Sequence, residues 1–379
     1  MKRAWKIIKK CLKWSFYFLI VTTGLIVIFI NSSPEFGGDP SKEDQARYSK
    51  TGHYENGEFK NIHVTKMDYT LEQILEVTSD YFSDDIQNIP KRPLKIMSLD
   101  SLQLEQSKHQ NSIVWFGHSA FLVQLDGKNI LFDPMFGDVP SPVDFMAQPR
   151  FFKELPLSIE QLPVIDFVFI SHDHYDHLDY ESINRLKDKT THFILPIGVG
   201  AHFEEWEVEA TKIHEYNWWD EDEIDGLHFA FTPSRHFSGR GIFNQNSTLW
   251  GSWVIRGKGK KIFFSGDGGY DDHFRQIGQK FGPFDLALME CGQYNKYWKN
   301  IHMLPEESAR AIQDVNADIG IPIHWGAFSL STHDWFEPPV RIKHAGDSLG
   351  VKIITPQIGE PVNLDSVTVG YKNWWTPFK

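Results

Sequence analysis

The stretch from Ser171 to Asp179 constrains this chain more than any other part of its sequence. It follows an apolar run, residues 164–170, that is typical of a buried strand. Within nine residues it sets three histidines and an aspartate in the pattern HxHxDH, namely His172, His174, Asp176 and His177. Imidazole nitrogen and carboxylate oxygen are ligands of catalytic Zn²⁺, which keeps one position open for water. A polar surface loop would explain a single His-x-His, but the full pattern at a strand end indicates a metal site.

Composition and charge narrow the class of protein. The chain has 379 residues, of which 41% are hydrophobic, so one large or two ordinary domains with a sizeable core are expected. The first 30 residues hold six basic side chains and no acid, and subtracting these six charges from the formal net charge of −12 leaves −18 for the rest. This negative charge argues against a nucleic-acid partner, because phosphate backbones are held by clustered Lys and Arg. The two cysteines, Cys11 and Cys291, exclude a disulfide framework and a thiolate-rich zinc site.

An uncharged apolar segment, residues 14–30, follows the basic N-terminus. As a helix it would be about 26 Å long, just enough to cross a hydrocarbon core of ~30 Å with help from Lys13 and Trp14 at the interface. We expect residues 1–30 to form an uncleaved single-pass anchor in the cell membrane. The body is then periplasmic, because all the basic residues precede the apolar segment and keep the N-terminus cytoplasmic. A cleaved signal peptide is the alternative, but the run is long and no small-x-small site follows it.

The rest of the chain divides into a lead-in and a catalytic domain. Residues 31–111 are expected to form a polar linker and an N-terminal lead-in with one helix capped by Thr70. From residue 112 to 370, strand-like runs alternate with helical patterns at 180–187 and 305–315, which predicts an α/β body with helices covering its sheets. The predicted strands are residues 113–116, 120–125, 129–132, 164–170, 192–195, 227–232, 252–255, 261–264, 286–289 and 319–323.

Three downstream strand ends offer the additional ligands that two metal ions require. His236 follows the run 227–232, Asp267 follows 261–264, and His324 follows 319–323. Taken singly each signal is weak, because a strand-end histidine is more often a hydrogen-bonded structural residue and Gly-Asp-Gly is more often a turn. Their joint occurrence after HxHxDH predicts a centre for two metals.

Together these motifs resemble the metallo-β-lactamase superfamily of metal-dependent hydrolases. The segments at 115–124 (WFGHSAFLVQ), 130–134 (ILFDP), 302–307 (HMLPEE) and 323–326 (IHWG) are similar to the branch that contains N-acylphosphatidylethanolamine-hydrolysing phospholipase D. The resemblance extends from about residue 112 to 340, and PEFGG at 34–38 is similar to bacterial members. It implies a mixed α/β fold, a four-layer αββα sandwich with the metals at one edge of its two sheets, here following an N-terminal transmembrane helix.

The resemblance also assigns roles to the candidate residues. It implies that His172, His174 and His236 hold a first metal, that Asp176, His177 and His324 hold a second, and that Asp267 bridges the two. Asp267 and Asp176 are the expected catalytic carboxylates. Two Zn²⁺ ions are the expected cofactors, although iron or manganese would also suit these ligands.

Further residues have two interpretations each. Asp133 either orients a ligating histidine or forms a turn before Pro134. His118 is expected to be a buried hydrogen-bonded residue rather than a ligand. His302 either faces the substrate or caps the helix that begins at Pro305. Five aromatic residues could line an acyl groove, although each alone is more simply a core or loop residue: Trp218, Trp219, Tyr294, Trp325 and Phe328.

The expected activity is that of a zinc-dependent phosphodiesterase of the phospholipase D type. It would hydrolyse N-acylphosphatidylethanolamine-like phospholipids by attack of a hydroxide that bridges the two metals. The anchor favours a membrane phospholipid as substrate, because tethering to the bilayer raises the local concentration at lipid head groups. A lactonase or other carbonyl-ester hydrolase on the same site is the enzymatic alternative. A membrane-tethered, non-catalytic metal-binding protein is the alternative of another class.

Overall fold

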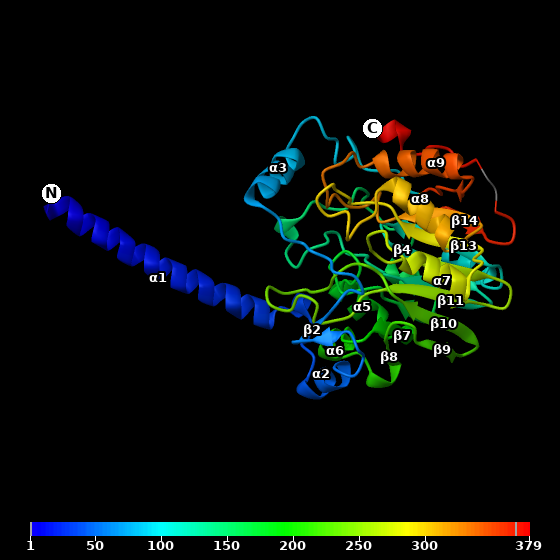
Figure 1. The fold of residues 1–379 in the computed structure, drawn as a ribbon, viewed down its shortest axis with the longest axis horizontal. Helices are drawn as coiled ribbons and strands as arrows, with labels where there is room; N and C mark the ends of the chain where they lie inside the picture. Colours follow the sequence, from blue (N-terminus) through cyan, green and yellow to red (C-terminus); the bar gives the residue numbers. More distant parts are fainter. Residues whose placement is uncertain (1, 368–369) are drawn as a thin grey trace.

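Two seven-stranded sheets form the centre of the protein in the computed structural model, which describes residues 2–367 and 370–379 (Figure 1). The first sheet contains β3 (Ser112–Gly117), β4 (Ala120–Leu125), β5 (Lys128–Phe132), β6 (Ile165–Phe169), β7 (Thr190–Pro196), β8 (Ile213–Tyr216) and β16 (Pro361–Asn363). The second contains β9 (Glu221–Ile224), β10 (Leu227–Thr232), β11 (Ser252–Arg256), β12 (Lys261–Phe264), β13 (Leu286–Glu290), β14 (Ile319–Ile323) and β15 (Lys352–Ile353). Their orders are β16-β3-β4-β5-β6-β7-β8 and β15-β14-β13-β12-β11-β10-β9.

Helices lie before, between and after these strands. They are α1 (Lys2–Ser32), α2 (Lys42–Tyr48), α3 (Leu71–Tyr81), α4 (Ser101–Gln106), α5 (Tyr180–Leu186), α6 (Gly200–Glu205), α7 (His273–Phe281), α8 (Pro305–Asp314) and α9 (Glu337–Leu349). A small hairpin of β1 (Tyr54–Glu55) and β2 (Glu58–Phe59) belongs to the lead-in.

Three apolar layers hold the sheets and helices together. Between the sheets, Phe132 packs on Phe264 with ring centroids 4.8 Å apart, and Phe169 meets the edge of Trp253 at 5.1 Å. A second cluster joins the outer face of the first sheet to α5 and α6, and a third joins the outer face of the second sheet to α7, α8 and α9. The expected four-layer αββα sandwich is therefore confirmed.

The parallel strands bring several loops to one edge of the sandwich. β5 to β8 pair in parallel in the first sheet, and so do β12 to β15 in the second. The residues that follow β5, β6, β12, β13 and β14 gather at this edge, because parallel strands end on the same side. His118 N–H donates to Trp325 O (3.1 Å), and His324 N–H donates to His118 O (3.0 Å), so the loop after β3 is joined to the loop after β14.

All ten predicted strands are present, with bounds within two residues of the prediction. The strands not predicted include β8 and β9, whose sequences IHEY and EDEI are polar and lie at the ends of their sheets. Such edge strands bury little apolar surface and so lack the hydrophobic pattern that reveals a central strand. The helices predicted at 180–187 and 305–315 each end one residue earlier than expected.

α1 is longer than the predicted span of residues 14–30. It begins at Lys2 and ends at Ser32, and residues 3–32 are long and apolar enough to cross a membrane. The basic residues before Trp14 continue the same helix because Lys and Arg are good helix formers and no proline occurs before Pro34. Figure 1 shows α1 projecting away from the body at one end of the molecule.

The turn that follows α1, residues 33–38, is docked on the body instead of forming a free linker. Arg240 donates from Nε and Nη2 to Glu35 O at 3.0 and 2.7 Å, and Trp206 Nε1 donates to Pro34 O at 2.8 Å. Arg240 is almost fully buried, and its Nη1 donates to Asp173 O at 2.7 Å. One side chain therefore connects the end of α1 to the HxHxDH loop.

Gly37 and Phe36 complete this docked turn. Gly37 has φ +69°, and a Cβ there would lie 2.2 Å from His202 Nδ1, so a side chain at this position would clash. Phe36 meets the edge of Tyr175, the central residue of the HxHxDH loop, at 6.4 Å between ring centroids. The position of α1 relative to that loop is thus fixed by packing on both sides of the turn.

Glu35 gives this docking a measurable pH dependence. Burial, aided by the charge of Asp179, raises the pKa of its carboxyl from 4.5 to about 7. The folded state then holds a proton that the unfolded state has released, so the free energy of unfolding falls as the pH rises from about 4.5 to 7. Because this carboxyl is partly exposed, we expect Glu35→Gln to raise Tm at pH 8 by only about 2 °C, with no gain at pH 4. Thermal unfolding at both pH values checks this, and an equal shift at both would contradict it.

Candidate metal centre

His172, His174 and His236 direct ring nitrogens toward one another. The first two lie in the loop after β6, and His236 lies in the loop after β10. His172 Nε2 is 2.9 Å from His174 Nδ1, which is 3.3 Å from His236 Nε2. Nitrogens bound to one tetrahedral Zn²⁺ at 2.0–2.1 Å are separated by roughly 3.3 Å. The three rings therefore have the spacing of ligands that share one cation.

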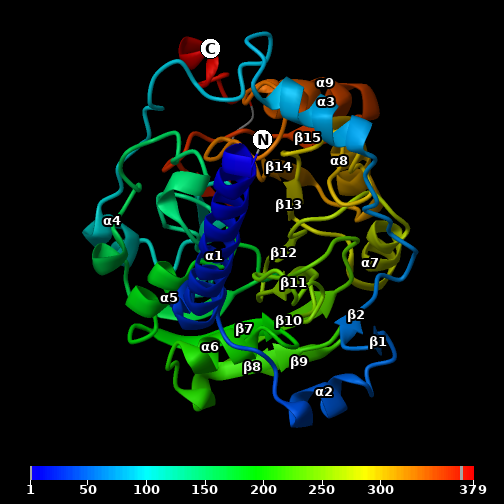
Figure 2. The same cartoon turned by 90° about the vertical axis from the view of Figure 1, so that its left-hand side faces the viewer.

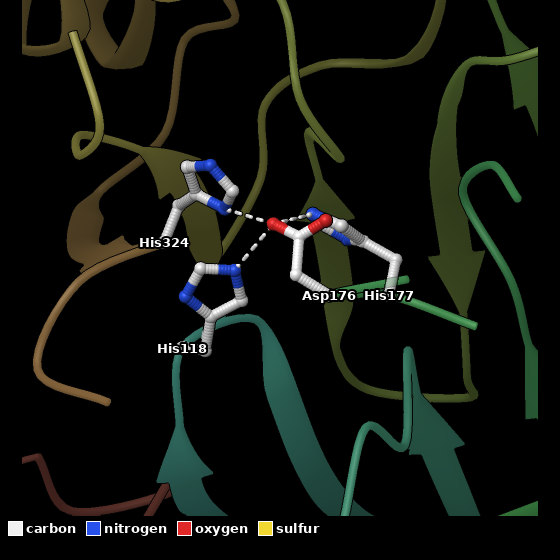
Figure 3. A group of neighbouring side chains, drawn as sticks. All are labelled: His118, Asp176, His177 and His324. Carbon is white, nitrogen blue, oxygen red and sulfur yellow. Dashed lines mark hydrogen bonds and ion pairs between the residues drawn. The ribbon is translucent and has the colours of Figure 1, made fainter. Parts of the chain in front are cut away.

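Asp176, His177 and His324 form a second group, and the structure adds His118 to it (Figure 3). Asp176 Oδ2 lies 3.5 Å from His177 Nε2 and 3.9 Å from His324 Nδ1. His118 Nε2 donates to the same Oδ2 at 2.8 Å, which is the buried hydrogen-bonded role expected for it. All four ligand atoms lie within 4.8 Å of one another, so His118 is also within reach of a cation bound here.

Asp267 lies between the two groups. Its Oδ1 is 3.2 Å from His324 Nδ1, and its Oδ2 is 3.2 Å from His177 Nε2. The same Oδ2 is 3.8 Å from His236 Nε2 and 3.9 Å from His172 Nε2. A carboxylate in this position can bridge two cations, and the structure thus brings together all seven ligands predicted from the sequence.

The centre satisfies the chemical requirements of divalent metals. Among the described residues, His177 Nε2 and Asp267 Oδ1 are buried without a hydrogen-bond partner. Such an unpaired atom costs about 1–3 kcal/mol, and a cation between these two would satisfy both. The donors are imidazole nitrogen and carboxylate oxygen, as in hydrolytic zinc sites. Cys291 is not one of them, because its Sγ is buried near Pro338 O, at 3.8 Å.

Hydrogen bonds on the outer ring nitrogens fix the orientation of two ligands. His177 Nδ1 donates to Asp133 Oδ2 at 2.7 Å, and His236 Nδ1 donates to Ile301 O at 2.9 Å. Asp133 is held in turn by the backbone N–H of Ser171, at 2.7 Å. Nε2 of both rings is left free to face the centre. Of the two roles considered for Asp133, these contacts support the orienting one.

Burial determines the charge of most of these groups. It lowers the pKa of His172, His236 and His324 well below the ordinary value, so the rings are neutral, as metal ligands must be. Burial also raises the pKa of Asp267, but the charge of His177 and its hydrogen bond outweigh this effect and hold the pKa of Asp267 well below its usual range. His177 is the exception: burial lowers its pKa, but the charges of Asp267, Asp176 and Asp133 outweigh burial and raise the pKa well above the ordinary value, so this ring must release a proton when it binds a metal.

An open cavity of about 280 Å³ lies over the centre. Besides five of the predicted ligands, it is lined by Tyr69, Phe237, Gln293, Trp298, Ile301, His302 and Leu330. His302 therefore faces the cavity. It does not cap α8, because the capping position before that helix is Leu304, whose backbone N–H donates to Glu307. Of the two roles considered for His302, this position supports the substrate-facing one.

The aromatic residues considered for an acyl groove lie elsewhere. Trp218, Tyr294, Trp325 and Phe328 are buried in the core, and Trp219 packs against it; among the described residues, none of the five lines the cavity. Their simpler interpretation as core residues therefore agrees with the structure. The aromatic lining comes instead from Tyr69, Phe237 and Trp298, which the sequence did not single out.

Glu290 is a buried carboxyl that the sequence reasoning missed. It is the last residue of β13, accepts from Met303 N–H at 2.9 Å, and lies behind His302, with Oε1 3.3 Å from His302 Nδ1. Burial raises the pKa of Glu290 to about 7. A signal did exist, because an acid directly after the apolar run 286–289 repeats the pattern that identified Asp267.

The fold and this ligand set define a metal-dependent hydrolase, and comparisons with known proteins agree. The family model described as "Beta-lactamase superfamily domain" matches residues 128–325. An uncharacterized protein of Mycobacterium tuberculosis is 34% identical over 352 residues, covering 91% of this chain and 93% of the relative. N-acyl-phosphatidylethanolamine-hydrolyzing phospholipase D 1 of Caenorhabditis elegans is 33% identical over 247 residues, covering 62% of this chain and 69% of that enzyme.

A solved structure gives the same fold. A possible metal-dependent hydrolase from Veillonella parvula has a TM-score of 0.54 at 14% identity, covering 67% of this chain and 99% of that one. The chain belongs to the metallo-β-lactamase superfamily, and its relatives include N-acyl-phosphatidylethanolamine-hydrolysing phospholipase D.

Asp267→Asn tests the bridging position. The amide carries no negative charge and has only one acceptor oxygen, so we expect the metal content, measured by mass spectrometry of the purified full chain, to fall from two ions to one or fewer. Asp179→Asn is the matched control in the HxHxDH segment. Asp179 caps α5 by accepting from Ser182 N–H at 2.8 Å, and Asn caps equally well. Full metal content in Asp267→Asn would contradict the bridging role.

Asp133→Asn tests the orientation of His177. Loss of this charged acceptor should weaken the affinity of the second metal about 10–100-fold, because the ring is no longer held with Nε2 toward the centre. Competition with a chromophoric chelator measures this affinity, and circular dichroism controls for folding. An unchanged affinity would leave Asp133 with a role in the turn alone.

Proposed function

We propose that the chain is a membrane-anchored, zinc-dependent phosphodiesterase of the phospholipase D type. Its substrates would be N-acylphosphatidylethanolamine-like lipids, and its products phosphatidic acid and an N-acylethanolamine. The observation that carries this proposal is the likeness to the Caenorhabditis elegans enzyme over most of the body. α1 supports it, because a helix able to cross a membrane would hold the body, proposed to be periplasmic, beside phospholipid head groups.

The cavity supports a phosphodiester with apolar tails. Its lining combines carboxylates and imidazoles that could hold the metals with four apolar side chains, Phe237, Trp298, Ile301 and Leu330. When bound, two metal ions would lower the pKa of water and neutralise charge that develops on the phosphoryl oxygens. Zinc suits a donor set of nitrogen and oxygen, although iron and manganese would also fit it.

Residues of the chain would position the substrate and move protons. Asp267 is central enough to accept the proton that water loses as its oxygen attacks phosphorus. His302 lines the cavity, and one of its ring nitrogens lies within 4.8 Å of ligand atoms of His236 and Asp267. It would donate a proton to the alcohol oxygen as the phosphorus–oxygen bond breaks. Glu290 would position His302 through Nδ1.

A carbonyl-ester hydrolase such as a lactonase is the alternative on the same site, because the same nucleophile also attacks carbon. A non-catalytic metal-binding protein is the alternative of another class. The presence of His302 and its partner Glu290 beside the ligands favours an enzyme, because a site that only stores metal has no use for a proton donor facing its cavity.

The decisive experiment incubates the zinc-loaded full chain, in vesicles, with a panel of phospholipids in ¹⁸O-labelled water. We expect mass spectrometry to detect phosphatidic acid with one labelled phosphate oxygen, since attack at phosphorus places the oxygen of water there. Asp267→Asn should lower the rate at least about 10²-fold. Activity on lactones or carboxyl esters alone would favour the alternative enzyme, and an inactive chain that holds two metals would favour the metal-binding protein.

A further inference from the structure

Three segments expose large apolar side chains at the end of the body from which α1 leaves. Phe243, in the loop 239–246, is 98% exposed, and Phe145, in the short 3-10 helix at 144–146, is 87% exposed. Met146, Ile242, and Leu71 and Leu75 of α3 are each more than half exposed. We call these six side chains the apolar rim. Side chains of this size are usually buried, so six in three separate segments need an explanation.

The figures place the three segments on one side of the molecule. In Figure 1 α3, the green helical turn near residue 145 and the yellow-green loop near residue 240 all lie at the end of the body that faces α1. Figure 2 looks onto that end and shows α3 at its upper right, while α1 projects from its centre. Leu71 and Leu75 are one helical turn apart and share one face of α3. A plane crossed by α1 could therefore touch all three segments.

The rim also adjoins the cavity. Tyr69, which lines the cavity, lies two residues before α3, and Phe237, which also lines it, leads into the loop 239–246. The docked turn 33–38 fixes the end of α1 beside the same loop, through Arg240. The end of the anchor, the rim and the mouth of the cavity are thus neighbours held by ordered contacts.

We infer that the apolar rim is a membrane-contacting surface, on which the body rests against the bilayer that α1 crosses, with the cavity mouth facing the lipid. This inference rests on the proposed function, because that function places the body at a membrane. The bilayer is the occupant favoured by the position of α1, which would bring this end to the membrane surface whether or not a second protein is present. The body has a formal charge of −18 and the six rim residues have none, so the contact depends on apolar burial and is insensitive to salt.

A site-specific fluorophore tests the contact in the full chain. Because Cys11 is exposed and Cys291 is buried, Cys11→Ser removes the accessible native thiol. Phe145→Cys and Phe243→Cys are then introduced singly, labelled with an environment-sensitive dye, and placed in phosphatidylcholine vesicles that contain acyl-chain nitroxide lipid. We expect quenching of at least about twofold at both positions, because interfacial apolar groups reach the acyl boundary, and the same quenching at high salt.

Lys258→Cys is the matched control. It is exposed in the turn before β12, and because β12 ends at the metal centre, that turn lies at the opposite edge of the sheet. This label should respond to aqueous iodide and not to the lipid quencher. Iodide accessibility at 145 and 243 equal to that at 258 would overturn the inference. Protection from both quenchers would overturn it too, because a second copy of the chain would then cover the rim. Quenching requires no hydrolysis. An inactive chain with quenched labels would therefore contradict the proposed phosphodiesterase activity and still support the membrane contact.

Discussion

Face-to-face packing of the two sheets is the constraint on which the rest of the structure depends. The ring pairs Phe132–Phe264 and Phe169–Trp253 join strands from opposite sheets, and each of these phenylalanines is the last residue of its strand. The loops that follow are therefore brought together by apolar burial and not by attraction between polar groups. The histidines and carboxylates meet because packing of the core fixes the positions of the strand ends that carry them.

The surrounding structure holds residues at the metal edge in strained backbone conformations. His118 and His324 both have positive φ, of 53° and 68°, which residues other than glycine adopt only where their surroundings hold them. The reciprocal backbone hydrogen bonds of their two loops supply that constraint. Asp133 and the carbonyl of Ile301 complete it by holding the ligand rings from behind. A rigid arrangement of this kind reduces the reorganisation that metal binding requires.

Central elements and the ligand set could be predicted from the sequence because their patterns are local. Apolar runs such as 164–170 identify buried strands, and polar residues directly after them identify the metal edge. β9 was not predictable, since EDEI carries no core-facing pattern, and neither was the docking of residues 33–38, which depends on Arg240 about two hundred positions away. Asp133 and His302 remained ambiguous because their roles depend on contacts with other loops. Glu290 shows that the same strand-end rule, applied to every strand, finds one more buried acid.

The contact between Arg240 and Glu35 has a consequence for the order of folding. The two residues are 205 positions apart, so the docked turn is a strongly non-local contact. α1 leaves the ribosome long before Arg240 is made, and the turn has no partner until the loop after β10 exists. Arg240 also donates to Asp173 O, so the HxHxDH loop gains this support only when the loop after β10 has been made. The metal centre also needs Asp267 and His324, so its last ligands are made only after the partner of the docked turn.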